Sequence, residues 1–190
     1  MIDASEISPD ELRPLRRSEY DRLVRAGVFC DERIELLAGM LVAVSPQGTE
    51  HSYAVRRLAR ALMRALGDRA EIFVQAPLAL SAASEPEPDI AVVAPGDYLD
   101  EHPRSALLIV EVADTSLQKD SGPKARLYAE AGIQDYWIVD LTNDAVLLHR
   151  APSGGAYTTL SRHQRGETIA MLACPDVDVS VDEVLPPPRA

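Results

Sequence analysis

An unbroken apolar run, Ala106-Leu-Leu-Ile-Val-Glu-Val-Ala113, constrains the fold of this chain more than any other segment. Such a run is typical of a strand that is buried on both faces of a sheet. Glu111 lies inside the run, and an ionised carboxylate is costly there unless a cation or hydrogen-bond donors hold it. A second buried strand is predicted upstream, where Pro88-Asp89 opens the run Ile90-Ala-Val-Val93. The sequence therefore predicts that two carboxylates, Asp89 and Glu111, lie on strands that form the core.

A lysine is predicted to join these carboxylates from a helix. Proline suits the first helical position and glycine commonly ends a helix, so a helix is predicted from Pro123 to Gly132. The spacing of its residues places Lys124 on one face with Leu127, Tyr128 and Ala131. We interpret Tyr128, like Trp137, as a core residue. Lys119, in the preceding loop, is expected to be exposed and is the second candidate.

The remaining pattern alternates helices with strands. Helices are predicted at 18–26 and 49–66, and a hairpin at 33–37 and 40–44. Buried or half-buried strands are predicted at 71–75, 78–81 and 136–139, and short antiparallel strands at 145–149, 157–160 and 168–172. The segment 114–122 is predicted to be irregular, and the proline-rich tail at 185–190 is predicted to be extended. This order predicts one α/β (α+β) domain over residues 1–190, with a mixed β-sheet flanked by helices and hairpins at both ends.

Composition narrows the functional classes. The chain has 190 residues, 46% of them hydrophobic, and no apolar stretch of the length that a membrane span needs. The N-terminus lacks the basic and apolar regions of a signal peptide, and Cys30 and Cys174 are isolated, so we expect a cytoplasmic protein with reduced thiols and no membrane partner. The net charge of −11 argues against a broad nucleic-acid footprint, leaves a local basic groove open, and suits a site that collects divalent cations.

The buried acids and the lysine suit metal-assisted hydrolysis. Two carboxylates on neighbouring strands, with a backbone carbonyl such as that of Val112, suffice for Mg²⁺, which keeps several waters. The ion would lower the pKa of a bound water, and Lys124 could orient that water during phosphodiester hydrolysis. The alternative is structural: Asp89 caps a turn and Glu111 forms a buried ion pair with Lys124. Buried ion pairs stabilise proteins poorly, so the functional interpretation is favoured.

These motifs together resemble the Uma family of restriction endonuclease-like proteins, which has the PD-(D/E)XK nuclease fold. The resemblance rests on Pro88-Asp89, on Glu35-Leu-Leu-Ala-Gly39, on His51, and on the stretch from Glu111 through Lys124 to Tyr136-Trp-Ile-Val-Asp140, and it runs from about Leu15 to beyond Asp140. It implies that Asp89 and Glu111 bind Mg²⁺ or Mn²⁺. In the wider superfamily the catalytic lysine usually follows the second acid by two residues, and this chain has Ala113 at that position. The resemblance therefore also implies that the catalytic lysine has migrated to Lys124.

Two further acid–base candidates and one departure accompany the resemblance. Family members usually have Ser and Pro where this chain has Asp114 and Thr115, and Asp114 adds negative charge near the site. The resemblance makes Glu35 an additional site acid, although an ion pair with a neighbouring arginine is an equal alternative. His51, at the start of a helix, could bind phosphate or shuttle a proton, or could be a structural histidine.

The polar face of the 49–66 helix carries the best candidate for contacts with DNA phosphates. Arg56, Arg60 and Arg64 recur every four residues on that face, although a solvated face or a subunit contact explains the same spacing. Restriction-type nucleases often cut two strands with two subunits, so a homodimer is expected.

The sequence therefore predicts a Mg²⁺-dependent endodeoxyribonuclease. Two alternatives stay open: a catalytically inactive nucleic-acid-binding or regulatory protein, and a small-phosphoester hydrolase. A wide basic cleft would favour DNA, and a closed acidic pocket would favour the small substrate.

Overall fold

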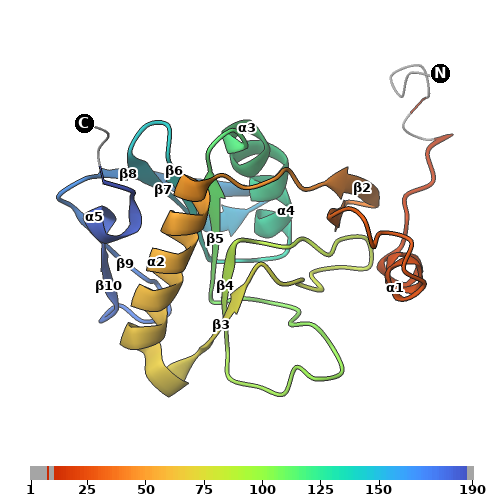
Figure 1. Ribbon diagram of the computed structural model, residues 1–190, viewed down its shortest axis with the longest axis horizontal. Helices are drawn as coiled ribbons and strands as arrows, with labels where there is room; N and C mark the ends of the chain where they lie inside the picture. Colours follow the sequence, from red (N-terminus) through yellow and green to blue (C-terminus); the bar gives the residue numbers. More distant parts are fainter. Residues whose placement is uncertain (1–7, 9–10, 188–190) are drawn as a thin grey trace.

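A six-stranded sheet forms the centre of the computed structural model, which describes residues 8 and 11–187 (Figure 1). Its strands, in spatial order, are β3 (Glu71–Val74), β4 (Ile90–Val93), β5 (Leu108–Ala113), β6 (Asp135–Asp140), β7 (Ala145–Ser153) and β8 (Ala156–Gln164). The neighbours β5 and β6 run parallel, and the other neighbouring pairs run antiparallel. The predicted mixed sheet is thus confirmed, and β4 and β5, the two strands that carry the acids, are neighbours.

Both faces of the sheet are covered, which explains why β5 reads as an unbroken apolar run. Alternate residues of a strand point to opposite faces. Leu108, Val110 and Val112 pack into a core under α2 (Thr49–Leu66), whereas Ile109 and Ala113 pack into a second core under α4 (Ala125–Glu130). Glu111 has the parity of the second set, so its side chain is directed toward α4.

Helix α2 packs on the sheet through its predicted apolar stripe. Ala54, Leu58 and Leu62 are completely buried, and the helix ends at Gly67, whose φ of +53° is unfavourable for residues with a side chain. A short 3₁₀ turn, η3 (Gly67–Arg69), leads from α2 into the edge strand β3. The same face of the sheet is completed by β9 (Thr168–Ala170), β10 (Asp178–Ser180) and α5 (Val181–Val184).

The N-terminal hairpin lies apart from the central sheet, next to α1 (Arg17–Arg25), at the right of Figure 1. Strands β1 (Ile34–Leu37) and β2 (Met40–Ala43) turn at Ala38-Gly39, both with positive φ. Only glycine fits the second position, because a Cβ there would lie 2.3 Å from Pro14 Cβ. A bridge between Leu36 and Glu85 attaches β1 to the body and leaves the neighbouring Glu35 completely buried.

The helix predicted from Pro123 to Gly132 begins earlier, and the predicted irregular segment at 114–122 is partly wrong. Helical structure starts at α3 (Leu117–Lys119), continues through a π-helical turn, η4 (Asp120–Lys124), and enters α4. Pro123 is therefore inside a helical stretch. The wide π turn accommodates a proline ring that would clash in a regular α-helix. Lys119 is consequently on a helix rather than in a loop.

The strand predicted at 78–81 is also wrong. The backbone N–H groups of Leu78 and Ala79 donate to Pro86 and Pro103, outside any ladder, and only the single bridge Ser81–Ser84 remains. Closely spaced prolines on both sides prevent regular pairing. Of the predicted tail, Leu185 is extended, and residues 188–190 lie outside the described residues. Within the described part of the chain, no helix has the length and apolarity required to cross a bilayer.

Candidate active site

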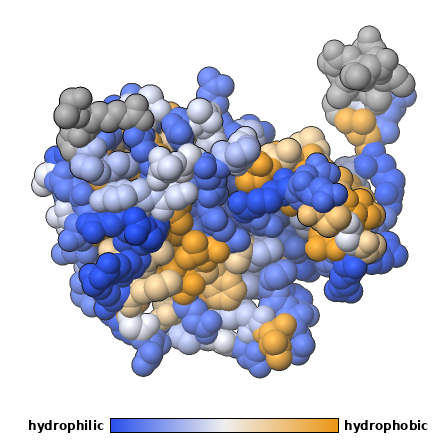
Figure 2. Space-filling model, viewed as in Figure 1, coloured by the Kyte–Doolittle hydropathy of each residue, from blue (hydrophilic) through white to orange (hydrophobic). Residues whose placement is uncertain are grey.

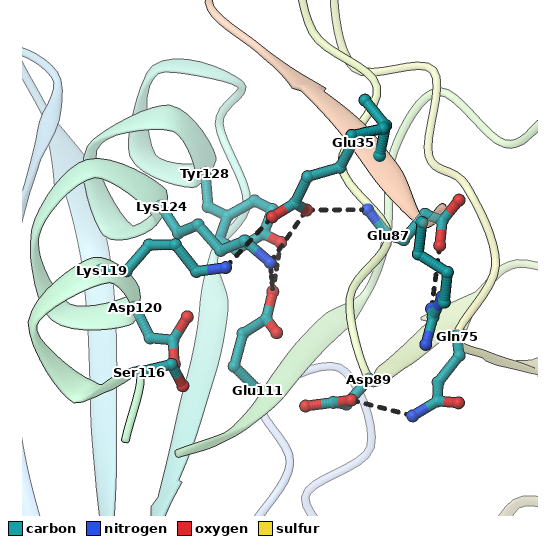
Figure 3. Close-up of polar contacts among 12 residues, drawn as sticks. Glu35, Gln75, Glu87, Asp89, Glu111, Ser116, Lys119, Asp120, Lys124 and Tyr128 are labelled. Atoms are coloured by element: carbon teal, nitrogen blue, oxygen red, sulfur yellow. Dashed lines mark hydrogen bonds and ion pairs between the residues drawn. The ribbon is translucent and has the colours of Figure 1, made fainter. Parts of the chain in front are cut away.

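A cavity of about 270 Å³ opens where β4 begins and β5 ends. The five predicted catalytic residues, Glu35, His51, Asp89, Glu111 and Lys124, all line it. They come from β1, α2, the start of β4, β5 and the π turn before α4, so segments far apart in sequence meet there. Figure 3 shows Glu35 reaching from β1 toward Lys119 and Lys124, with Glu111 and Asp89 alongside.

Lys124 lies between two buried carboxylates. Its Nζ is 2.9 Å from Glu111 Oε1 and 3.1 Å from Glu35 Oε2, and none of the three residues is more than 4% exposed. The cations that pair with Glu35 are both lysines, since Lys119 Nζ lies 3.3 Å from its other oxygen. The alternative interpretation of Glu35 required an ion pair with an arginine, and its partners are lysines instead. Lys119 is half-buried, not the exposed residue that we expected.

The ionisation of this cluster follows from its burial and its charge balance. Burial raises the pKa of the Glu111 carboxyl, Lys124 opposes that rise, and Asp89, Asp120 and Glu35 add to it. Burial disfavours the Lys124 ammonium, but Glu111 and Glu35 outweigh this effect and raise its pKa. The Tyr128 hydroxyl also donates to Glu111 Oε1 at 2.6 Å. Two lysines thus face Glu35 and Glu111, and Asp89 and Asp120 give the cluster an excess of carboxyl groups.

Asp89 is held mainly by uncharged donors. The Val112 N–H donates to its Oδ2 at 2.8 Å, and His51 Nε2 lies 3.0 Å from the same oxygen. The Gln75 and Gln47 amides approach its Oδ1 at 3.2 and 3.5 Å. Asp89 therefore joins β4 to β5 and does not cap a local turn. The other part of the structural alternative, the buried ion pair between Glu111 and Lys124, is present. His51 Nδ1 is buried and has no hydrogen-bond partner among the described residues.

The donor set suits a hard cation. Asp89 and Glu111 supply oxygen ligands only, and within the described residues Glu111 Oε2 makes no hydrogen bond. No group of three or more His, Cys, Asp or Glu side chains in the described part of the chain is arranged to hold a metal ion. Two carboxylates with water and carbonyl oxygens suffice to bind Mg²⁺ or Mn²⁺. Zinc and copper prefer sulfur or nitrogen ligands, which these two residues do not supply.

Residues 17–182 match the model of the Uma2 family, which carries the description "Putative restriction endonuclease". The chain belongs to the Uma2 family. The predicted family membership is thereby confirmed.

Solved structures bear on the fold. An Anabaena variabilis protein reported as a "putative nuclease belonging to DUF820" aligns with a TM-score of 0.70 and 16% identity, over 90% of this chain and 97% of that one. This similarity shows a shared fold. The type IIG restriction endonuclease BpuSI aligns over 56% of this chain and 12% of its own, with 20% identity and a TM-score of 0.39, too low to support a conclusion. No curated protein matches.

The sequence of this Uma2 protein did not reveal several residues around the site. Tyr128 is a core residue, as predicted, but its hydroxyl also contacts Glu111. Gln47 and Gln75 contact Asp89 from a loop and from the end of β3, where no periodicity marks them. Asp120 lines the cavity because the π turn begins at that residue. Only the contact of Tyr128 could have been predicted from the sequence, since Tyr128 follows Lys124 by one helical turn and so lies on the same face of the helix.

The predicted phosphate-binding arginines do not enter the cavity. Arg56, Arg60 and Arg64 are exposed on α2 and line an adjacent groove between α2 and β3. Gln47 lines both the groove and the cavity. Asp114, the departure from the family pattern, is exposed at the cavity wall.

Proposed function

We propose that this Uma2 protein is a divalent-metal-dependent endonuclease that hydrolyses phosphodiester bonds in DNA. The observation that carries the proposal is the convergence of Asp89, Glu111 and the buried ammonium of Lys124 on one cavity. The family description supports a nuclease, and the oxygen-only donor set supports Mg²⁺ or Mn²⁺.

In this proposal Asp89 and Glu111 hold the ion, with the Val112 carbonyl as a further ligand. When bound, the ion supplies charge neutralisation at the scissile phosphate and a more acidic water. Lys124 lines the cavity and is paired with Glu111 and Glu35, which leaves a third N–H group that can orient the attacking water or contact a phosphoryl oxygen. Glu35 keeps Lys124 charged and fixed in position, and His51 holds Asp89 through Nε2.

DNA would reach the cavity along α2. Arg56, Arg60 and Arg64 are exposed and form no ion pair with a described carboxylate, so their guanidinium groups are available to phosphates. A homodimer and a cytoplasmic location remain predictions of this proposal.

A small-phosphoester hydrolase is the second candidate, and one observation favours it. The cavity is small, and its acidic side chains outnumber the basic ones. A cavity of that kind admits a compact substrate more readily than a duplex. The arginine-lined groove beside the cavity favours DNA, because a small phosphoester would not need it.

A plasmid assay separates these candidates. We expect the wild-type protein to nick supercoiled DNA with millimolar Mg²⁺ or Mn²⁺ but not with EDTA. Asp89→Asn, purified in the same way, should lower the rate by about 100-fold or more. Cleavage of bis(p-nitrophenyl) phosphate without cleavage of DNA would select the small-substrate candidate. No cleavage of either substrate, or equal rates for the variant, would contradict the proposal.

A further inference from the structure

A second concave surface lies between α2 and the edge strand β3. This groove has a volume of about 560 Å³. Apolar side chains form its floor and walls, namely Val55, Ala59, Met63 and Val74. Met63 and Val74 are 49% and 40% exposed, so both side chains are accessible to a molecule in the groove. Figure 2 shows an apolar patch at this place, bordered by hydrophilic residues over α2.

The rim of the groove is positively charged in a protein of net charge −11. Arg56, Arg60 and Arg64 follow one another along α2, at intervals of about 6 Å along the axis. That interval is similar to the distance between successive phosphates of one nucleic-acid strand. Charge complementarity therefore points to a polyanion. A second copy of the chain across a two-fold axis would place these arginines against themselves, which disfavours a dimer through this face.

The groove is connected to the cavity through two amides. Gln47 lines both, and Gln75 lines the groove and lies at the end of β3. The Gln75 amide donates to Gln47 Oε1 at 2.7 Å and to Asp89 Oδ1 at 3.2 Å. A molecule in the groove thus lies next to the side chains that fix one of the two carboxylates. An occupant of the groove would therefore adjoin a molecule bound in the cavity.

We propose that the groove binds an unstacked base of a single-stranded DNA segment, with the backbone on the three arginines and the adjoining phosphate at the cavity. This inference rests on the proposed function and names its substrate class. An apolar wall and guanidinium planes can cover the faces of a base that has left its stack, and amides can bond its edge. Bases inside a duplex cannot present those faces. The surface is concave, whereas insertion into a membrane requires a protruding apolar face.

Fluorescence anisotropy in EDTA measures this preference without cleavage. The probes are a short fluorescein-labelled oligonucleotide of mixed sequence, its blunt duplex, and the duplex with a single-stranded tail. We expect the wild-type protein to bind the single strand and the tailed duplex about fivefold or more tightly than the blunt duplex. Vesicles of phosphatidylglycerol and phosphatidylcholine provide the membrane arm.

Matched variants test the groove itself. Met63→Glu places a charge on its apolar wall, and Arg60→Glu reverses a charge on its rim. Each should weaken single-strand binding by about tenfold, since a stacked base and a phosphate contact contribute on this scale. Leu99→Glu, at a residue 87% exposed in the 94–103 loop, and Arg22→Glu, on α1, repeat the same changes elsewhere and should stay within about twofold of the wild type. Thermal melts verify that all four variants fold.

Each outcome decides the inference separately from the proposed function. Equal or tighter binding of the blunt duplex would overturn it, and so would groove variants that behave like their controls. Vesicle binding that the groove variants abolish, with oligonucleotide binding unchanged, would also overturn it. If the wild-type protein shows the expected preference and variant losses but cleaves no DNA with any metal, the proposed function fails and the groove inference stands.

Discussion

Replacement of Lys124 by methionine is the most informative perturbation of the site, because it removes the charge and keeps most of the side-chain volume. Lys124 Nζ contacts both Glu111 and Glu35, and all three side chains are buried. Removal of one partner from a buried ion pair costs about 3–5 kcal/mol, since a charge is left unpaired. For a chain of 190 residues this corresponds to a fall in Tm of about 6–20 °C.

Urea unfolding of Lys124→Met at pH 8 measures the loss. At pH 6 the loss should be smaller, because the raised pKa of Glu111 allows its unpaired carboxyl to take up a proton. Addition of Glu111→Gln should restore about 1–3 kcal/mol, because neighbouring charges couple on that scale. Lys119→Met is the matched control. Its side chain is 32% exposed, so the pair with Glu35 should contribute only about 0–1 kcal/mol.

A Lys124→Met variant within about 1 kcal/mol of the wild-type free energy of unfolding would contradict the buried ion pair. The ammonium would then be a solvated group that happens to lie near the acids. An equal loss for Lys119→Met would also refute it, because burial would not be what distinguishes the two lysines.

Three further predictions concern metal binding, Tyr128 and His149. Mn²⁺ should raise the Tm of the wild type but not that of Asp89→Asn. The rise in Tm should be larger at pH 9 than at pH 6, because the raised pKa of Glu111 lets protons compete with the metal at the lower pH. Equal rises at both pH values would contradict this prediction. Tyr128→Phe should cost about 1.5–3 kcal/mol in urea unfolding, as it removes a donor to a buried carboxylate, and an unchanged midpoint would contradict the contact. Burial lowers the pKa of His149 below 6.5, so the unfolded chain takes up a proton at a higher pH than the folded chain does, and the free energy of unfolding falls as the pH drops below 6.5. His149→Phe should make the free energy of unfolding less dependent on pH in that range. An unchanged slope of the free energy of unfolding against pH would contradict the burial effect.

The sheet and its acids could be predicted because the signals were local. The apolar run at 106–113 gave β5, and the period-2 pattern of a strand then sends Glu111 to the same side as α4. Helical spacing gave the orientation of Lys124 even though the start of its helix was wrong. Two residues of the cavity, Glu111 and Lys124, could thus be predicted from periodicity and the high cost of buried charge.

The parts that could not be predicted depend on contacts between distant segments. The π turn allows Pro123 inside a helical stretch, which no rule for helix starts anticipates. That shift makes Lys119 part of a helix, where its ammonium reaches Glu35. Gln47 and Gln75 are polar residues at irregular positions, so only the folded chain brings them to Asp89. The pairing of Glu35 with lysines depends likewise on where the β1–β2 hairpin attaches.

The position of a bound divalent ion would show whether Asp89 and Glu111 form a metal site. Crystals of the protein soaked with Mn²⁺ and measured at the manganese absorption edge would locate it by anomalous scattering. The account predicts one anomalous peak in the cavity, at about 2.0–2.3 Å from a carboxylate oxygen of Asp89 and one of Glu111, with Lys124 beside it and no peak in Asp89→Asn crystals. An empty cavity at saturating Mn²⁺, or an ion bound elsewhere in the protein, would contradict the assignment of these residues as a metal-dependent active site.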